Sequence, residues 1–259
     1  MSELLFEVEG GIGTITINRP ERRNALNDAV LEGICDAVEA ARKNPEIRLL
    51  ALRGAGKKAF SSGGDLTGMR LDDTFGPMGA HFARSRYSRT LQALTNAHVP
   101  VVGIANGDVL AGGLGLFLAC DLTVAVESAR LGLPEVHVGL FPMMVMAVLF
   151  RNLGRKRAME LLLLGEKISA EQALEWGLLN RVFPAGTFEA DTRAFLDRLA
   201  DRPGMVVRLG KIAYNAIEAI PPATLELLQT SLGNVMMTED FAEGVQSFLE
   251  KRKPSWTHR

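Results

Sequence analysis

Glycine turns and one glutamate are the residues of this sequence best suited to chemistry. An apolar run over 101–104 is typical of a buried strand, and it is followed by a turn that reaches Gly112 and Gly113. The residues after this turn, 114–120, are apolar on all sides and predict a buried helix. The first N–H groups of a helix have no partner inside it, and the helix dipole favours negative charge there. The turn could therefore hold a ligand oxygen that carries negative charge.

Two further features favour this functional interpretation over a simple packing turn. A second glycine turn lies upstream at 60–65, and a glutamate, Glu135, lies downstream. A lone Gly-Gly pair is more often a tight packing turn, and a lone loop glutamate is more often an exposed acid or a helix N-cap. In combination, the two glycine turns and Glu135 predict backbone N–H donors beside a carboxylate.

Composition excludes several classes of function. The chain has 259 residues, is 47% hydrophobic and has a formal net charge of −1. It can bury one sizeable core, and it offers no overall charge that would attract nucleic acid or an anionic membrane. The most apolar stretch, 139–150, is too short to span a bilayer. We therefore expect neither nucleic acid partners nor a membrane span.

The cysteines and the first residues suggest a compartment. Cys35 and Cys120 lie in apolar helical patterns and predict buried thiols of a reducing compartment. The first ten residues have no basic start and no apolar run, so we expect no signal peptide. These features predict a cytoplasmic protein.

Strands alternate with helices up to about residue 185, and helices alone follow. This alternation predicts an α/β fold with a parallel-rich core, and the helical end predicts a lid or an oligomerisation layer. We expect a hairpin of strands 5–9 and 14–17, further strands at 47–52, 101–104, 122–126 and 178–183, and an extended segment and loop at 131–136. We expect helices from the Asn27 cap to about 43, around 82–94, over 114–120, 145–152, 155–164 and 170–176, and then over 188–200, 205–218, 223–237 and 239–251, with a helical turn that Asp65 could cap.

Several motifs in this order resemble the crotonase (enoyl-CoA hydratase/isomerase) superfamily, and the resemblance covers almost the whole chain. They are Phe60-Ser-Ser-Gly-Gly-Asp-Leu66, Ala105-Asn-Gly with Ala111-Gly-Gly113 and Ala119-Cys-Asp121, Leu133-Pro-Glu-Val136, Asn18-Arg-Pro20 with Asn24-Ala-Leu26, Leu164-Gly-Glu-Lys-Ile168, Gly177-Leu-Leu-Asn180, and Glu243-Gly244 through Phe248 to Pro254. The resemblance implies a crotonase-like (ClpP/crotonase) spiral of repeated ββα units over 1–187. It also implies a C-terminal helical region over 188–259 that forms a homotrimer, or a hexamer built as a dimer of trimers.

The resemblance also implies the substrate and its binding groups. The substrate would be an acyl-CoA thioester, and the N–H groups of Gly64 and Gly112 would hold its carbonyl as it becomes an enolate-like oxyanion. Coenzyme A would be part of the substrate, and no separate cofactor is expected. Further substrate-binding residues would be Arg23, Ser62, Asp65, Leu66, Gly113, Phe141, Phe248 and Lys251.

One position departs from the pattern of the hydratases. They carry a glutamate three residues after the second oxyanion glycine, where this chain has Gly115, and they share a second glutamate, here Glu135. One carboxylate suffices to take a proton from one carbon and return it to another, so we expect a double-bond isomerase that uses Glu135. Hydration with water placed by another group, a carbon–carbon lyase or decarboxylase, and a non-catalytic acyl-CoA-binding protein remain alternatives.

The stretch at 140–146 is methionine-rich and has no acid. Dienoyl-CoA isomerases and aryl-CoA dehalogenases of the superfamily carry an aspartate in this region, so its absence here counts against both activities. The methionines suit either an adaptable acyl pocket, to which Phe141 would belong, or simple core packing.

The remaining candidates carry weaker signals. His137 could orient the carboxylate and Asp108 could line the pocket, although both residue types are more often structural at such positions. Ser61 and Ser62 lack a motif that supplies a histidine base, so a serine nucleophile is disfavoured. The four histidines and two cysteines show no metal-ligand spacing, and no dinucleotide-binding glycine motif occurs.

Overall fold

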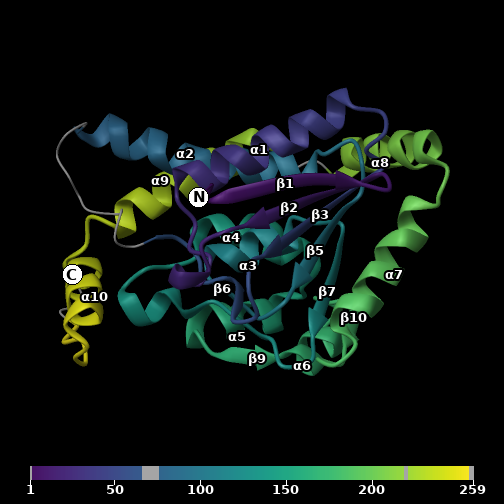
Figure 1. Cartoon of the computed structure of the whole chain (residues 1–259). Helices are drawn as coiled ribbons and strands as arrows, with labels where there is room; N and C mark the ends of the chain where they lie inside the picture. The colour runs from purple at the N-terminus through teal and green to yellow at the C-terminus, as the bar shows by residue number, and fades with distance from the viewer. Residues whose placement is uncertain (1, 66–75, 219–220, 257–259) are drawn as a thin grey trace.

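The computed structural model describes residues 2–65, 76–218 and 221–256, and the strands in them form two sheets (Figure 1). The larger sheet has the order β1-β2-β3-β5-β7-β10, and the smaller has the order β4-β6-β8-β9. The larger contains β1 (Leu4–Glu9), β2 (Ile12–Ile17), β3 (Leu49–Gly54), β5 (Val101–Ala105), β7 (Leu122–Val126) and β10 (Arg181–Phe183). The smaller contains β4 (Ala59–Ser61), β6 (Asp108–Leu110), β8 (Arg130–Gly132) and β9 (Lys167–Ser169).

The chain enters the two sheets in turn, which produces the repeated ββα unit. The pairs β3 and β4, β5 and β6, and β7 and β8 each give one strand to each sheet. The units are followed by α2 (Gly76–Thr95), by α3 (Gly112–Leu118), and by the 3₁₀ helix η3 (Pro134–Val138) with α4 (Met143–Asn152). The strands β3, β5 and β7 pair in parallel, and so do β4, β6 and β8. The predicted α/β fold with ββα units is confirmed.

Local sequence explains the element boundaries near the N-terminus. Gly10 and Gly11 adopt positive φ angles and close the antiparallel hairpin of β1 and β2. The Asn27 side chain accepts a hydrogen bond from the Val30 N–H and caps α1 (Asp28–Lys43). The strands β3 and β5 are almost entirely buried, as their continuous apolar runs predict.

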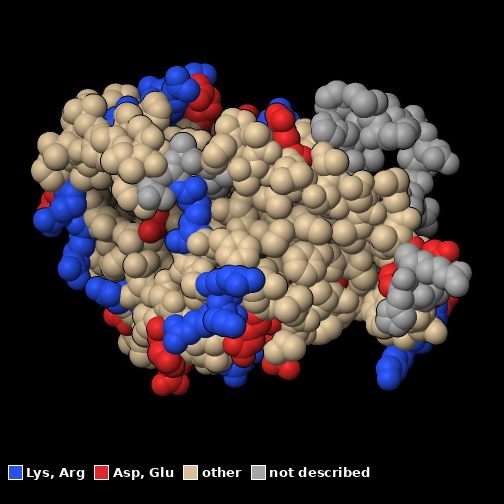
Figure 2. All heavy atoms as spheres, turned by 180° about the vertical axis from the view of Figure 1, so that it is seen from behind, with Lys and Arg blue, Asp and Glu red and all other residues tan. Residues whose placement is uncertain are grey.

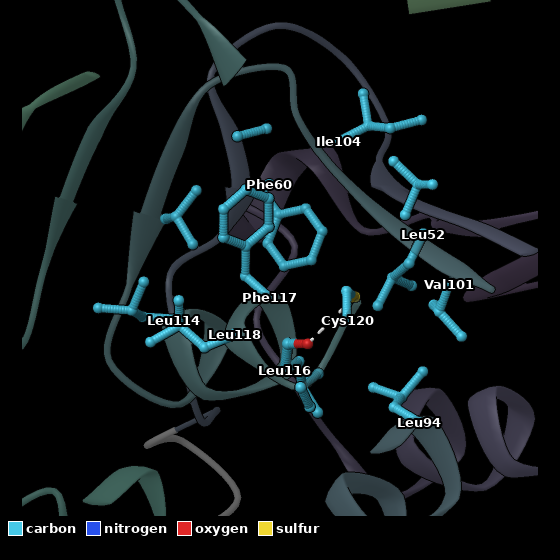
Figure 3. Close-up of a cluster of buried hydrophobic side chains, with 14 of the residues drawn as sticks. Leu52, Phe60, Leu94, Val101, Ile104, Leu114, Leu116, Phe117, Leu118 and Cys120 are labelled. Atoms are coloured by element: carbon cyan, nitrogen blue, oxygen red, sulfur yellow. Dashed lines mark hydrogen bonds between the residues drawn. The ribbon is translucent and has the colours of Figure 1, made fainter. Parts of the chain in front are cut away.

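Aromatic packing joins the smaller sheet to α3. Phe60 of β4 and Phe117 of α3 meet edge to face, with ring centroids 5.3 Å apart, inside a cluster of buried side chains (Figure 3). In the same cluster the Cys120 thiol donates to the Leu116 carbonyl at 3.4 Å. Both cysteines are free thiols; Cys120 is buried as predicted, whereas Cys35 is partly exposed.

The C-terminal helices cover different parts of this core. Figure 1 shows α7 (Phe188–Ala200) and α8 (Gly204–Glu218) at one side of the molecule and α10 (Glu239–Glu250) at the opposite side. The helix α9 (Pro222–Val235) packs on α4 and α2, and α10 packs on η3. The buried Lys211 of α8 pairs with Asp121 at 2.5 Å and donates to the Val99 carbonyl at 2.9 Å, which fixes α8 to the core. The other helices are α5 (Arg155–Leu164), α6 (Ala170–Glu175) and the 3₁₀ helix η1 (Pro20–Arg22).

The structure corrects several expected boundaries. The three-residue strands β4, β6 and β9 were not predicted, because so few residues show no periodicity. The segment expected to be extended at 131–136 instead ends β8 and begins η3, and the last strand is shorter than 178–183. The helical turn expected after Asp65 lies outside the described residues.

Candidate active site

The parallel order of the smaller sheet brings the predicted functional segments to one edge. In register, Ser61 of β4 lies beside Val109 of β6, and Leu110 of β6 lies beside Gly132 of β8. Because parallel strands end at the same edge of a sheet, the segments after β4, β6 and β8 emerge together there. These segments carry Gly64, Gly112 and Glu135, respectively. The fold thus gathers residues that are more than 70 positions apart in sequence.

The two glycine turns lie in direct contact. Gly63 has a φ of +95°, and a Cβ atom built on it would lie 2.5 Å from the Ala111 Cβ and 3.2 Å from the Gly112 nitrogen. Only glycine fits this conformation and this approach. The contact sets the position of the Gly64 turn relative to the Gly112 N–H.

The N–H groups of Gly64 and Gly112 are available to a ligand. Leu26 N–H donates to the Gly63 carbonyl at 2.8 Å, and Asp65 N–H donates to the Leu26 carbonyl at 2.9 Å. The N–H group of Gly64, between these two residues, takes no part in this pairing. Gly112 is the first residue of α3, where an N–H has no partner within the helix. Across the described ranges, neither N–H donates a hydrogen bond.

Buried polar groups hold the upstream turn in place. The Asn24 side chain, 1% exposed, donates to the carbonyls of Ala59 at 2.7 Å and Ala55 at 3.0 Å. The Asp65 carboxylate pairs with Arg19 at 2.8 Å and with Arg22 at 3.4 Å. Through these ion pairs Asp65 helps to fix the turn. The predicted contact of Asp65 with substrate stays a prediction.

Glu135 lies in η3 with one carboxylate oxygen buried and free. Its Oε2 atom is the only buried carboxylate oxygen that lacks a hydrogen-bond partner among the described residues. Burial raises the pKa of Glu135 to about 7, because the charged form loses its hydration. A carboxyl group with this pKa can both accept and return a proton near neutral pH.

Tyr87 of α2 is the site residue that the sequence analysis missed. Its hydroxyl donates to the Gly112 carbonyl at 2.6 Å. A Cβ atom built on Gly115 would collide with the same hydroxyl, so the phenol fills the space that a side chain at position 115 would need. Burial and the nearby charge of Glu135 raise the pKa of Tyr87 well above its usual range. Tyr87 therefore stands among Gly112, Gly115 and Glu135.

Other predicted substrate-binding residues lie at varying distances from this centre. The Arg23 carbonyl accepts from the Ser62 N–H at 3.0 Å, so the exposed Arg23 and the partly exposed Ser62 adjoin the upstream turn. Gly113 packs against Ser61, since a Cβ atom there would lie 2.8 Å from the Ser61 Cβ. Phe141 is partly buried against the core.

The predicted residues of the C-terminal region lie at exposed positions of α10, the helix that packs on η3. Phe248 of α10 is 57% exposed, and Lys251 caps that helix with a φ of +55° on the surface. Leu66 lies outside the described residues.

The two lesser candidates have structural contacts. The His137 Nε2 atom lies 3.0 Å from the Leu164 carbonyl, and the Asp108 carboxylate accepts from the Arg130 N–H at 3.2 Å and pairs with Lys167 at 3.3 Å. These contacts tie η3 to the end of α5 and join the β6, β8 and β9 strands. Neither residue is needed to explain the site.

Comparison with known proteins assigns the family. The sequence pattern described as "enoyl-CoA hydratase/isomerase" matches residues 7–259. The chain belongs to the enoyl-CoA hydratase/isomerase family. It is therefore a crotonase-superfamily enzyme that acts on an acyl-CoA thioester.

Three relatives show the breadth of this family. The chain is 33% identical over 258 residues to the mitochondrial enoyl-CoA hydratase domain-containing protein 3 of Danio rerio, covering 98% of this chain and 87% of that protein. It is 36% identical over 263 residues to the 1,2-epoxyphenylacetyl-CoA isomerase of Escherichia coli, covering 99% of each. The crystal structure of carnitinyl-CoA hydratase from Mycobacterium avium superposes with a TM-score of 0.85 at 33% identity and covers 100% of both chains.

Membrane-spanning helices and metal-ligand clusters are both absent from the described residues. No helix within the described ranges is both long and apolar enough to cross a membrane. In the same part of the chain, no three His, Cys, Asp or Glu side chains are grouped as a metal site would require.

Proposed function

We propose that this family member moves a double bond along the acyl chain of its substrate, with Glu135 as the single proton carrier. The observation that supports this most is the buried Oε2 of Glu135, without a partner among the described residues, in a carboxyl group whose pKa is about 7. Position 115, where the hydratase pattern places a second acid, is a glycine covered by the Tyr87 hydroxyl.

The proposed reaction uses three groups. Glu135 takes a proton from C2 of a 3-enoyl-CoA, and the electrons of the broken C–H bond form the enolate. The N–H groups of Gly64 and Gly112 donate to the thioester oxygen as it becomes negative. Glu135 then gives its proton to C4 while the double bond settles between C2 and C3.

Two alternatives predict different products. A hydratase would add water to C3 of a 2-enoyl-CoA, and a lyase or decarboxylase would break a carbon–carbon bond on the same oxyanion site. A non-catalytic acyl-CoA-binding protein would do neither. The charge of Glu135 acts on Tyr87, which itself contacts Gly112, so Glu135 lies near one of the proposed oxyanion donors, and this supports chemistry over binding alone.

The test is incubation of the protein with 3-enoyl-CoA and with 2-enoyl-CoA in D2O, followed by NMR of the products. We expect a double-bond shift with the wild type and loss of that shift with Glu135→Gln. Hydration by the wild type at a rate comparable to the double-bond shift would favour the hydratase alternative. No turnover, with retained CoA binding, would contradict enzymatic function on both substrates.

We also propose that Arg23, Ser62, Gly113 and Phe141 contact the substrate and that no cofactor is needed beyond the coenzyme A that the substrate carries. Arg23 is exposed beside the upstream turn, where a positive charge would meet CoA phosphates. The two free thiols are consistent with a cytoplasmic location, which also stays a prediction.

Self-association through the C-terminal region at 188–259, as a homotrimer or a dimer of trimers, completes the proposal. The face of the molecule in Figure 2 includes broad areas without charged side chains. Large apolar side chains of α8 are exposed, with Val206 at 70%, Leu209 at 59% and Ile217 at 82%. Such exposure on one helix is typical of a protein interface. In such an assembly, Phe248 and Lys251 would reach the acyl group and the phosphates of a neighbouring subunit.

A further inference from the structure

Tyr87 occupies the space next to Gly115, the position at which the hydratase pattern places a second acid. Its phenol oxygen would collide with a Cβ atom at position 115, and its ring lies 3.5 Å from where a Cβ atom on Gly112 would be. Val145 of α4 also borders this space, since its Cγ2 atom would lie 3.1 Å from the same Gly115 Cβ. The space above Gly115 is thus filled by a side chain from a different helix.

The hydroxyl of Tyr87 is not suited to carry a proton itself. Its hydrogen is donated to the Gly112 carbonyl at 2.6 Å, and burial and the charge of Glu135 oppose ionisation of the phenol. A group that is already hydrogen-bonded and stays neutral neither activates water nor supplies protons to the substrate. Its effects are to occupy space and to hold the Gly112 peptide.

From this geometry we infer that Tyr87 is a specificity-determining residue, which keeps water and a second acid away from the bound acyl chain so that the substrate exchanges protons only with Glu135. The inference rests on the proposed function and extends it. In a dry site the proton that Glu135 removes is the one it returns, and no water stands ready to add to C3. Hydration needs a water molecule at C3. Its oxygen bonds to C3, one of its protons passes to Glu135, and the proton that Glu135 already carried passes to C2.

The first measurement uses the wild type and follows one proton. A 3-enoyl-CoA that carries deuterium at C2 is converted in H2O, and the deuterium at C4 of the product is measured by mass spectrometry. We expect most product molecules to retain the label, because the protonated Glu135 carboxyl is shielded from water. Complete loss of the label would overturn the inference even if isomerisation itself proceeds.

The second measurement compares variants with 2-enoyl-CoA. Tyr87→Ala opens the space above Gly115, and we expect the ratio of hydration to double-bond shift to rise by roughly tenfold or more, because water can enter. Tyr87→Phe keeps the ring but removes the hydroxyl, which is both the donor to the Gly112 carbonyl and the atom nearest to position 115. We therefore expect a lower kcat and a ratio between those of the wild type and Tyr87→Ala. Tyr214→Phe, on the exposed face of α8, is the matched control and should change neither.

The outcomes separate this inference from the proposed function. If the folded Tyr87→Ala protein shows no gain in hydration, the inference is overturned while isomerisation by Glu135 stands. If the wild type shows no double-bond shift, the proposed function fails, and a gain of hydration in Tyr87→Ala would still support water exclusion. If Tyr87→Ala does not fold, the fraction of deuterium that the wild type retains at C4 decides whether the inference stands.

Discussion

Two regions of the molecule differ in how far contacts within one chain cover their groups. One is the sheet edge where β4, β6 and β8 end, and the other is the outer face of α8. At the strand ends, the turn around Gly63 is held by contact with Ala111 and by buried Asn24, and the N–H groups left free are those that a ligand oxygen needs. On α8, Val206 and Leu209 lie in water with no partner in the described part of the chain to cover them, although burial of such groups stabilises a protein by about 25 cal/mol per Å². One chain thus positions the free N–H groups by its own contacts, whereas it leaves the apolar surface of α8 exposed.

Replacement of the buried acid should have the largest effect at the strand-end site. Glu135→Gln keeps the shape of the side chain but cannot carry a proton, so kcat for the double-bond shift should fall by about 100- to 10,000-fold. Stopped-flow or coupled absorbance assays would measure this, and circular dichroism would verify the fold. Loss of less than about tenfold would contradict proton transfer by Glu135.

Two glycines test whether contact between the turns matters. Gly63 and Gly177 both have positive φ, +95° and +83°, but only Gly63 has neighbours within 4 Å of an added Cβ. Gly63→Ala should displace the turn that carries Gly64 and lower kcat by about 100-fold, since small misplacements of reacting groups are costly.

Gly177→Ala is the matched control for this strain. It should lower the free energy of unfolding by about 1 kcal/mol and leave kcat unchanged. Equal loss of activity in both variants would show that backbone strain alone, and not contact between the turns, is responsible.

The buried carboxyl should also make stability depend on pH. The folded pKa of Glu135, about 7, lies above its ordinary value of 4.5, so the folded state favours the protonated form. Stability should therefore fall as pH rises from 4.5 through 7, by up to about 3 kcal/mol, and remain lower above that range. Glu135→Gln should be more stable than the wild type at pH 8 by up to this amount and equal to it near pH 4.5, as measured by urea denaturation.

A charge on the exposed face of α8 should prevent self-association. Leu209→Glu places a charge on the exposed apolar face, and we expect it to abolish self-association while changing the stability of the isolated chain by no more than about 0.5 kcal/mol. Sedimentation velocity would measure the assembly. Val8→Glu on β1, also exposed at 47%, is the control. An assembly unchanged by Leu209→Glu would remove α8 from the interface.

The sequence predicts this molecule best where local signals suffice. The Asn27 cap begins α1, and the helices predicted at 155–164 and 188–200 have the bounds of α5 and α7. The family motifs single out Gly64, Gly112 and Glu135 as candidate site residues, and the fold brings the segments that carry them to one edge of the smaller sheet. The short strands were missed because three residues such as those of β6 pair only through tertiary contacts.

Tyr87 was missed for a related reason. In sequence it is one apolar position of a helix, 25 residues before Gly112, and nothing local shows which side of the helix faces the site. The only available signal was Gly115 itself, because a glycine on a buried helix implies that another side chain fills its place.

The pH dependence of kcat/KM for double-bond migration tests most directly whether the single Glu135 carboxylate performs the proton transfer. The basic form of Glu135 must be present in the free enzyme, so kcat/KM should rise with pH through a midpoint near 7 and then level off. Glu135→Gln should lose this dependence together with the activity. A wild-type profile that is flat from pH 5.5 upward, or a variant that retains the same midpoint, would contradict the account.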